Sequence, residues 1–230
     1  MKTKLKTLRL FGFWPLRWML AICLGLGTAV ATGNLMMTGV GAAGSCVCPN
    51  WTAPSGGLLA STNLSSATIV GGTLNTSNAS SPDCTTDAST FVENTTNGLH
   101  GPTWTTFSVS LSNAQMTFRI WIEQGVGSRT VDIQVGNQGT GYLYMNMNPT
   151  TGAVNTLQND NGFGSSVFGS TTPLYLFGKP GWEVTMSAAG VTATSLFVNL
   201  YSDNATGSGN SYTGDGVSSL VYWGLAVSTP

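Results

Sequence analysis

Short stretches of alternating apolar and polar residues run through the chain from about residue 64 to its C-terminus, separated by clusters of Gly, Asn, Asp and Ser. Alternation with a period of two is typical of half-buried strands, and many short strands between turn residues predict a sandwich or barrel. The predicted strands span residues 105–111, 116–123, 130–136, 142–148, 183–187, 195–202 and 219–227. No stretch of this region has a helical period, so we expect an all-β fold.

The alternation also assigns the two faces of each predicted strand, because successive side chains point to opposite sides of a sheet. The predicted core positions are Phe118, Ile120, Ile122, Val131, Ile133, Val135, Leu143, Met145, Met147, Leu196, Val198 and Leu200. The opposite faces combine aromatic rings with amides and a few charges. By this parity Trp121 points outward, and we expect its ring to be exposed.

The N-terminal segment has the pattern of an export signal. Basic residues up to Arg17 precede an apolar run over residues 18–31, and small-residue cleavage motifs end at Ala31 and Ala43. An uncleaved anchor is the alternative, because no charge interrupts residues 18–43. We therefore predict a signal peptide or membrane anchor over residues 1–43, a linker over 44–60 and a β-sandwich domain over 61–230. The protein is expected to be secreted or at an extracellular or virion surface, with membrane contact only through the N-terminus.

Charged residues make up only 7% of the chain and are segregated. Five of the eight basic residues lie in the first 17 positions, whereas all nine acidic residues lie beyond residue 80. The body carries three basic and nine acidic residues, a net charge of −6. We expect no nucleic-acid partner, since such binding needs a basic patch.

Three cysteines remain once Cys23 of the leader is set aside: Cys46, Cys48 and Cys84. An exported protein meets conditions that permit disulfides. We expect Cys84 to pair with Cys48, with Cys46 as the alternative partner.

Several motifs resemble those of a family of β-sandwich domains that is common in phage tail fibres and spikes and looks like the jelly-roll carbohydrate-binding modules. The matching segments are 81–88, 118–125, 141–147, 151–154, 181–184 and 211–227, the last of which contains a Tyr-Thr-Gly-Asp-Gly turn. Two of them depart from the family's pattern: Cys84 replaces a glycine, and Glu183-Val184 differs from the usual residues. The resemblance covers roughly residues 61–227. It implies an antiparallel jelly-roll β-sandwich and framework roles for Trp182 and Trp223. For the function it implies either attachment to a surface or a purely structural role.

Aromatic and polar side chains of the outward faces form a candidate glycan-binding site. Aromatic rings pack on the apolar faces of sugars, while amides, carboxylates and arginine bond the hydroxyls. The candidate residues are Arg119, Trp121, Glu123, Gln134, Tyr142, Tyr144, Asn199 and Tyr201. The expected partner is a cell-surface glycan or polysaccharide. The alternative is a structural virion or cell-surface protein whose aromatic face packs against other subunits, as in a homo-oligomer.

No catalytic site is expected. His100, the only histidine, lies in a glycine-flanked loop and is expected to be solvated. Glu123 and Asp132 form the one carboxylate pair that glycosidase chemistry would suit, if their strands were neighbours. We expect their carboxylates to form salt bridges with Arg119 and Arg129 instead, so the protein is predicted not to be an enzyme.

No cofactor is expected, with a structural calcium ion as the alternative. Calcium takes six or more oxygen ligands, and oxygen-bearing side chains crowd two loops. These are Asp203, Asn204, Asn210 and Asp215 before the last strand, and Asp83 and Asp87 in an early loop.

Overall fold

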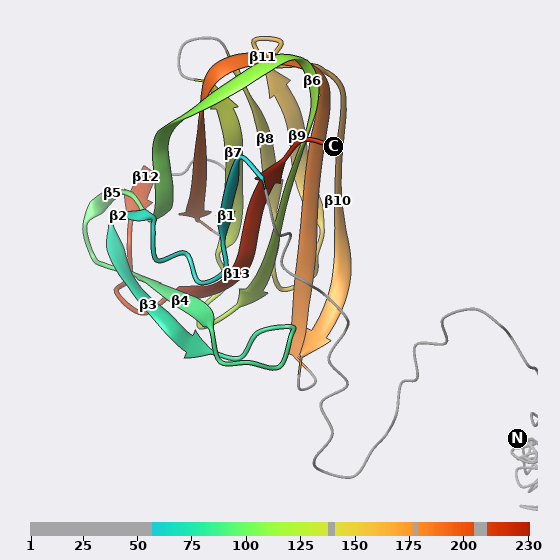
Figure 1. Cartoon of the computed structure of the whole chain (residues 1–230). Helices are drawn as coiled ribbons and strands as arrows, with labels where there is room; N and C mark the ends of the chain where they lie inside the picture. The colour runs from blue at the N-terminus through green and yellow to red at the C-terminus, as the bar shows by residue number, and fades with distance from the viewer. Residues whose placement is uncertain (1–56, 138–140, 177–178, 205–210) are drawn as a thin grey trace, which may run out of the picture. The chain divides into compact units, whose positions relative to one another are not determined.

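The computed structural model describes residues 57–137, 141–176, 179–204 and 211–230 (Figure 1). Every regular element within them is a β-strand, as predicted, and all strand pairs are antiparallel. The strands are β1 (Leu59–Ser61), β2 (Thr68–Val70), β3 (Gly72–Ala79), β4 (Ala88–Glu93), β5 (Asn97–Leu99), β6 (Gly101–Gln124), β7 (Thr130–Asn137), β8 (Gly141–Met147), β9 (Val154–Asp160), β10 (Ser165–Leu176), β11 (Lys179–Asp203), β12 (Ser211–Thr213) and β13 (Ser219–Ser228). None of the described segments forms a helix that could cross a bilayer.

The two long strands β6 and β11 connect the two layers of the sandwich (Figure 1). The first part of β6 pairs with β2 and with the end of β11. On the other side of β11 this layer continues with β7, β8 and β9, each paired with the strand before it. The second part of β6 pairs with β13 and with the start of β11, which also pairs with β10. Each long strand therefore belongs to one layer at one end and to the other layer at its other end.

The sequence pattern divided each of these long strands into two. Residues 105–111 and 116–123 both lie in β6, and residues 183–187 and 195–202 both lie in β11. Asn113 and Gly190, which look like turn residues, have φ angles of 52° and 69° at the places where the register between the strands shifts. Such irregularities bend a strand without ending it, which explains the difference.

The core between the layers contains the residues that alternation assigned to it. All twelve predicted core side chains have a relative exposure of 0%, which confirms the parity of the predicted strands. At about 25 cal/mol per Å² of apolar surface, this contiguous core is the main source of stability. The core side chains of β7, β8 and β11 also determine which residues these strands present on the outer face.

The prediction that Trp121 exposes its ring is wrong. Trp121 does lie on the face opposite Ile120 and Ile122, but its relative exposure is 0%. A second, smaller apolar cluster covers that face, formed by Trp121 with Ala88, Leu174, Val221 and Trp223. Parity gives only the direction of a side chain, and here β4, β10 and β13 supply apolar neighbours on the outer side as well.

Two of the motifs that carry the family resemblance pack against each other. The indole nitrogen of Trp182 donates a hydrogen bond to the carbonyl oxygen of Pro149 at 2.9 Å. Its ring lies against Gly152, where a Cβ atom would come within 2.3 Å of the indole and where φ is +72°. Trp182 is thus part of the framework.

The Tyr-Thr-Gly-Asp-Gly turn is held by a buried ion pair. Glu93, 2% exposed, accepts a hydrogen bond from Arg129 Nε at 3.1 Å, one from the Tyr212 hydroxyl and one from the backbone N–H of Asp215. The guanidinium of Arg129 lies 4.6 Å from the centre of the Tyr212 ring, close enough for a cation–π contact. This turn is therefore a structural feature of the domain.

The prediction that His100 is a solvated loop residue is also wrong. His100 is 0% exposed, and its ring centre lies 4.6 Å from that of Tyr212. Gly71 and Gly214 pack so closely against the ring that a Cβ atom on either would come within 3 Å of it. The two glycines make room for the buried ring.

Cys84 is disulfide-bonded, and its predicted partners Cys48 and Cys46 lie outside the described residues. Its φ angle of 65° is in the left-handed region, which costs a non-glycine residue roughly 1 kcal/mol or more. Glycine would adopt this conformation without that cost. The leader also lies outside the described residues, and β1 begins at Leu59, two residues inside the predicted linker.

Candidate functional site

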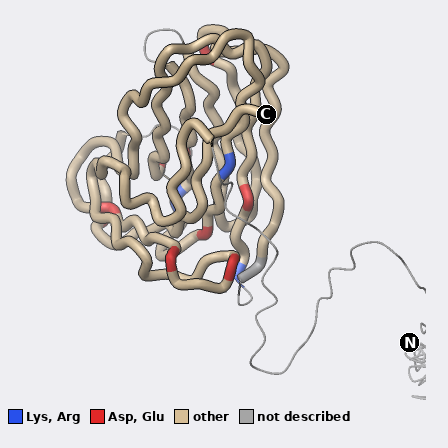
Figure 2. The backbone as a smooth tube through the Cα atoms, in the orientation of Figure 1, with Lys and Arg blue, Asp and Glu red and all other residues tan. Residues whose placement is uncertain are grey.

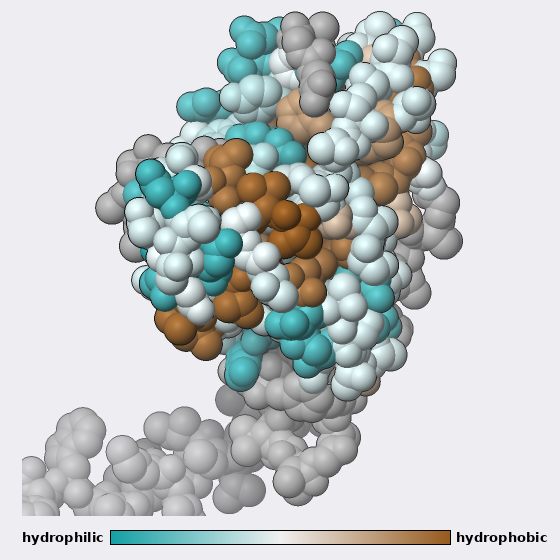
Figure 3. All heavy atoms as spheres, turned by 90° about the vertical axis from the view of Figure 1, so that its left-hand side faces the viewer, coloured by the Kyte–Doolittle hydropathy of each residue, from teal (hydrophilic) through white to brown (hydrophobic). Residues whose placement is uncertain are grey.

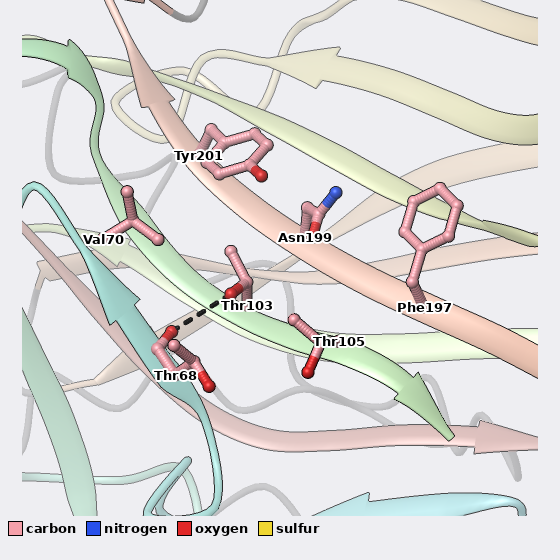
Figure 4. A pocket seen from close by; sticks show the side chains of 7 residues that line it. All are labelled: Thr68, Val70, Thr103, Thr105, Phe197, Asn199 and Tyr201. Atoms are coloured by element: carbon pink, nitrogen blue, oxygen red, sulfur yellow. Dashed lines mark hydrogen bonds between the residues drawn. The ribbon is translucent and has the colours of Figure 1, made fainter. Parts of the chain in front are cut away.

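A pocket of about 370 Å³ opens on the outer face where β2, β6 and β11 meet (Figure 4). This volume is at the lower end of the range for small-molecule sites. The lining residues are Thr68 and Val70 of β2, Thr103 and Thr105 of β6, and Phe197, Asn199 and Tyr201 of β11. The wall therefore offers hydroxyl groups, one amide, one aliphatic side chain and two aromatic rings, and it contains no charged residue.

The strands position these side chains by simple alternation. Leu196, Val198 and Leu200 enter the core, so Phe197, Asn199 and Tyr201 emerge together on the other side of β11. The opposite wall is formed by β2. A hydrogen bond joins β6 to it, in which the Thr103 hydroxyl donates to the Thr68 carbonyl oxygen at 3.2 Å. Apolar side chains gather across the middle of the side of the molecule on which β2, β3 and β5 lie (Figure 3).

A row of polar side chains continues from the pocket across the sheet. The register places Asn199 opposite Thr103 on β6 and opposite Gln134 on β7, and Gln134 opposite Tyr144 on β8. Within this row the Asn199 side-chain nitrogen donates to Gln134 Oε1 at 3.2 Å. Neighbouring strands are about 4.8 Å apart, so hydrogen-bonding groups recur at that interval along a line across the strands.

A second line across the strands carries two aromatic rings. Phe197 of β11 and Tyr142 of β8 lie on either side of Gly136 in the strand register. Their ring centres are 6.3 Å apart with an interplanar angle of 57°. Gly136 has no side chain to separate them. The pair extends the aromatic surface from the pocket toward β8, and the prediction that Tyr142 belongs to an outward face is consistent with this position.

Asp132, 2% exposed, lies on the same side of β7 as Gln134 and supports the polar part of this face. Its Oδ1 accepts hydrogen bonds from the Tyr144 hydroxyl at 2.7 Å and from the Asn146 side-chain nitrogen at 2.6 Å. Burial raises the pKa of Asp132, and the two hydrogen bonds oppose that shift only in part. Burial and the hydrogen bond with Asp132 also raise the pKa of Tyr144. The carboxyl group orients Tyr144 and Asn146 rather than facing solvent itself.

The raised pKa of Asp132 predicts the pH dependence of an Asp132→Asn variant. A carboxyl whose pKa is higher in the folded state stabilises the fold fully below its unfolded pKa of about 3.9, and this contribution is lost as pH rises through the folded pKa. Asparagine does not titrate. The melting temperature of the variant, relative to the parent, should therefore increase by a few degrees between pH 3 and pH 7, roughly as expected for 1 kcal/mol in a domain of this size.

Asp83→Asn is the matched control because the sign is reversed. Burial acts to raise the pKa of Asp83, but hydrogen bonds from Ser81 and Thr85 outweigh it and lower the pKa. The melting temperature of the parent, relative to this variant, should therefore increase as the pH rises toward about 4. Thermal melts at several pH values decide, and equal signs for the two variants would contradict the assignment.

Five of the eight predicted site residues are brought together on this face: Gln134, Tyr142, Tyr144, Asn199 and Tyr201. The other three belong to the layer that β6 forms with β13 and the start of β11. There Arg119 Nε donates to Glu183 Oε1 at 2.8 Å, Trp121 is in the small apolar cluster, and Glu123 Oε1 lies 3.9 Å from Lys179 Nζ. The sequence pattern could not separate the two ends of β6, because it did not show that one strand serves both layers.

The carboxylate pair named from the sequence is not formed. β11 lies between β6 and β7, so Glu123 and Asp132 are not on neighbouring strands. Burial raises the pKa of Glu123, and the nearby Lys179 opposes this shift. The arginines expected beside the pair bind other partners, since Arg119 pairs with Glu183 and Arg129 with Glu93.

The predicted calcium ligands Asp83, Asp87 and Asp215 have hydrogen-bond partners within the domain. The Asp215 carboxylate already accepts hydrogen bonds from the backbone N–H groups of Val217 and Ser218 and from the Ser218 hydroxyl. The carboxylates of Asp83 and Asp87 both accept hydrogen bonds from the hydroxyls of Ser81 and Thr85. No group of three His, Cys, Asp or Glu side chains suited to a metal is found in the described part of the chain, and Asn210 lies outside it.

Five pocket residues were not among the predicted site residues: Thr68, Val70, Thr103, Thr105 and Phe197. Phe197 had a usable signal, because it shares the outward parity of Asn199 and Tyr201. Extending the alternation of Phe107, Val109 and Leu111 toward Gly101 would have placed Thr103 and Thr105 on the core side, because the pairing register shifts between Phe107 and Trp104. Thr68 and Val70 lie on a three-residue strand with no periodic signal of its own.

Comparison with known proteins gives little further information. The chain matches no protein-family model and no curated protein sequence. Among solved structures it is similar to the CBM22-1 xylan-binding domain of Xyn10C from Paenibacillus barcinonensis, with 10% identity and a TM-score of 0.42. That match covers 78% of this chain and 97% of that domain. At this level the similarity carries no information about the ligand of this chain.

Proposed function

We propose that the domain is a non-catalytic surface-attachment module that binds a glycan through the pocket and the polar row beside it. The supporting observation is the composition of one continuous face. The Phe197–Tyr142 pair offers aromatic surface, and Asn199, Gln134 and the pocket threonines offer amides and hydroxyls within reach of it. Sugars have both apolar ring faces and many hydroxyls, so they suit such a surface better than a purely apolar ligand does.

The spacing of the row favours a glycan chain over a single sugar. Thr103, Asn199, Gln134, Tyr144 and Gln158 follow one another in register across β6, β11, β7, β8 and β9. The interval between strands is close to the advance of one sugar residue along an extended chain. We propose that the chain runs across the strands, so that successive residues meet successive members of the row.

The setting of this function follows the sequence predictions. We propose that the sandwich has jelly-roll topology and that the N-terminal segment directs export, which places the binding face outside the cell or on a virion. The family resemblance to tail-fibre domains and the sparse charge of the body support this setting (Figure 2).

Replacing Phe197 with alanine tests the proposed function. The variant should lose about 10- to 100-fold in affinity for a glycan that the parent binds, because one stacking ring is removed. The change in melting temperature should be small, since the ring is only partly buried. A screen of the full-length protein on a glycan array identifies the ligand, and isothermal titration calorimetry then compares parent and variant.

Phe168→Ala is the matched control, because Phe168 is 56% exposed on β10 and does not line the pocket. It should bind as the parent does. Unchanged binding by the Phe197 variant would reject this face. A parent that binds no glycan and forms oligomers in solution would favour a structural-subunit role instead.

A further inference from the structure

We infer that the ligand is an uncharged glycan, and that glycans bearing carboxylate, sulfate or phosphate groups are excluded by the charge arrangement of the domain. This inference rests on the proposed function and specifies the substrate class of the same face. Its basis is the position and pairing of every basic side chain in the body of the protein.

Each of the three basic residues beyond position 17 already has an acidic partner. Arg119 pairs with Glu183, Lys179 lies 3.9 Å from Glu123, and Arg129 pairs with Glu93 and lies 3.4 Å from Asp215. None of the three lines the pocket. Proteins that recognise carboxylate or phosphate groups usually present arginine or lysine to them, and this face presents neither.

The charges that do lie near the face are negative. Asp132 is buried beside Tyr144 and Asn146, and Asp160 lies opposite Tyr142 on the line across the strands that carries the two aromatic rings. Burial and the neighbouring Asp160 carboxylate raise the pKa of Tyr142. An anionic group bound here would lose water without gaining a counter-charge, and the net charge of −6 would repel it.

The hydrogen-bonding groups of the pocket wall favour a ligand with hydroxyl groups. Thr68, Thr103, Thr105 and Tyr201 supply hydroxyls, and Asn199 supplies an amide, so the wall contains both donors and acceptors. A sugar hydroxyl also donates and accepts, so it can use either kind of group. A carboxylate or sulfate group only accepts, so it would leave the acceptor oxygens of these groups without a donor from the ligand.

The test compares neutral polysaccharides with acidic counterparts of similar backbone, measured on the full-length protein in EDTA to remove bridging cations. Suitable pairs are hydroxyethylcellulose with carboxymethylcellulose, dextran with dextran sulfate, and desialylated with sialylated glycans. In a pair that binds, the neutral member should bind at least about tenfold more tightly, and its affinity should change less than about twofold between low and high salt.

Two lysine variants separate a local from a global charge effect. Thr68→Lys places a cation on the pocket wall, whereas Val217→Lys adds the same charge at a residue that is 60% exposed and does not line the pocket. The first should raise affinity for the acidic member several-fold, and the second should leave it nearly unchanged. Equal gains in affinity for the acidic glycan would overturn the inference that charge at the pocket itself excludes acidic ligands.

The other outcomes are also distinct. Tighter binding of the acidic members by the parent, weakening with salt, would overturn the inference and leave the proposed function intact. Failure of every pair to bind would contradict the proposed function, and the inference with it.

Discussion

Replacing Trp121 with alanine is expected to destabilise the sandwich by about 3–5 kcal/mol, the usual cost of deleting a fully buried indole. Trp121 is 0% exposed and packs with Trp223, Leu174, Val221 and Ala88 in the cluster on the outer side of β6. We expect the space left by the ring to close only in part, because β4, β6 and β13 are held by their backbone pairing. Urea unfolding followed by tryptophan fluorescence measures the loss.

A glycine beside the ring gives an independent test of the same packing. A Cβ atom added at Gly181 would lie 2.4 Å from Cζ2 of Trp121, so Gly181→Ala should also destabilise the domain. The double variant should lose less than the sum of the two single changes, because the cavity left by Trp121→Ala accepts the added methyl group. Phe168→Ala, at an exposed aromatic residue, should change stability by less than about 0.5 kcal/mol. A Trp121→Ala variant that melts like the parent but fails to bind glycan would instead show that the Trp121 ring is exposed and contacts the ligand.

Replacing Arg129 with alanine is the second change expected to have a large effect, about 3–5 kcal/mol. The side chain of Glu93 is 1% exposed, and Arg129 is its cationic partner. Without the guanidinium, a buried carboxylate remains with only the Tyr212 hydroxyl and the Asp215 backbone N–H as hydrogen-bond donors. The loss is therefore mainly the cost of an uncompensated buried charge, which chemical denaturation should detect.

Arg119→Ala is the matched control for Arg129→Ala. Its ion pair with Glu183 is more exposed, with side-chain exposures of 33% and 18%, so its loss should cost about 1 kcal/mol or less. Adding Glu93→Gln to the Arg129 variant should recover part of the stability, because the buried charge is removed. Equal and small losses for the two arginine variants would show that Glu93 is solvated in solution.

The sequence was sufficient for the direction of the side chains in each strand. Ile133, Met145 and Val198 illustrate this, since each was assigned to the core by alternation and each is completely buried. Period-two patterning predicts such directions because a shift of one residue would expose the whole apolar set. The same rule placed Asn199, Gln134 and Tyr144 on one side of their strands.

The pattern could not show what lies above a face. Trp121 and Tyr144 both point away from the core, but Trp121 is covered by β10 and β13, whereas Tyr144 remains partly exposed. Coverage depends on contacts between residues far apart in the chain, such as Trp121 and Leu174, and these leave no local trace. The same limit applies to His100, whose burial depends on close approach by Gly71 and Gly214.

The most direct measurement for the proposed binding face is an NMR titration of isotope-labelled protein with a neutral oligosaccharide found in the array screen. The side-chain amide signals of Asn199 and Gln134 and the backbone amide signals of Thr103 and Thr105 should shift progressively with ligand. The indole N–H signal of Trp182, bound to the Pro149 carbonyl oxygen in the framework, should stay in place. Shifts that centre on Trp182 and β10, with Asn199 and Gln134 unmoved, would contradict the account.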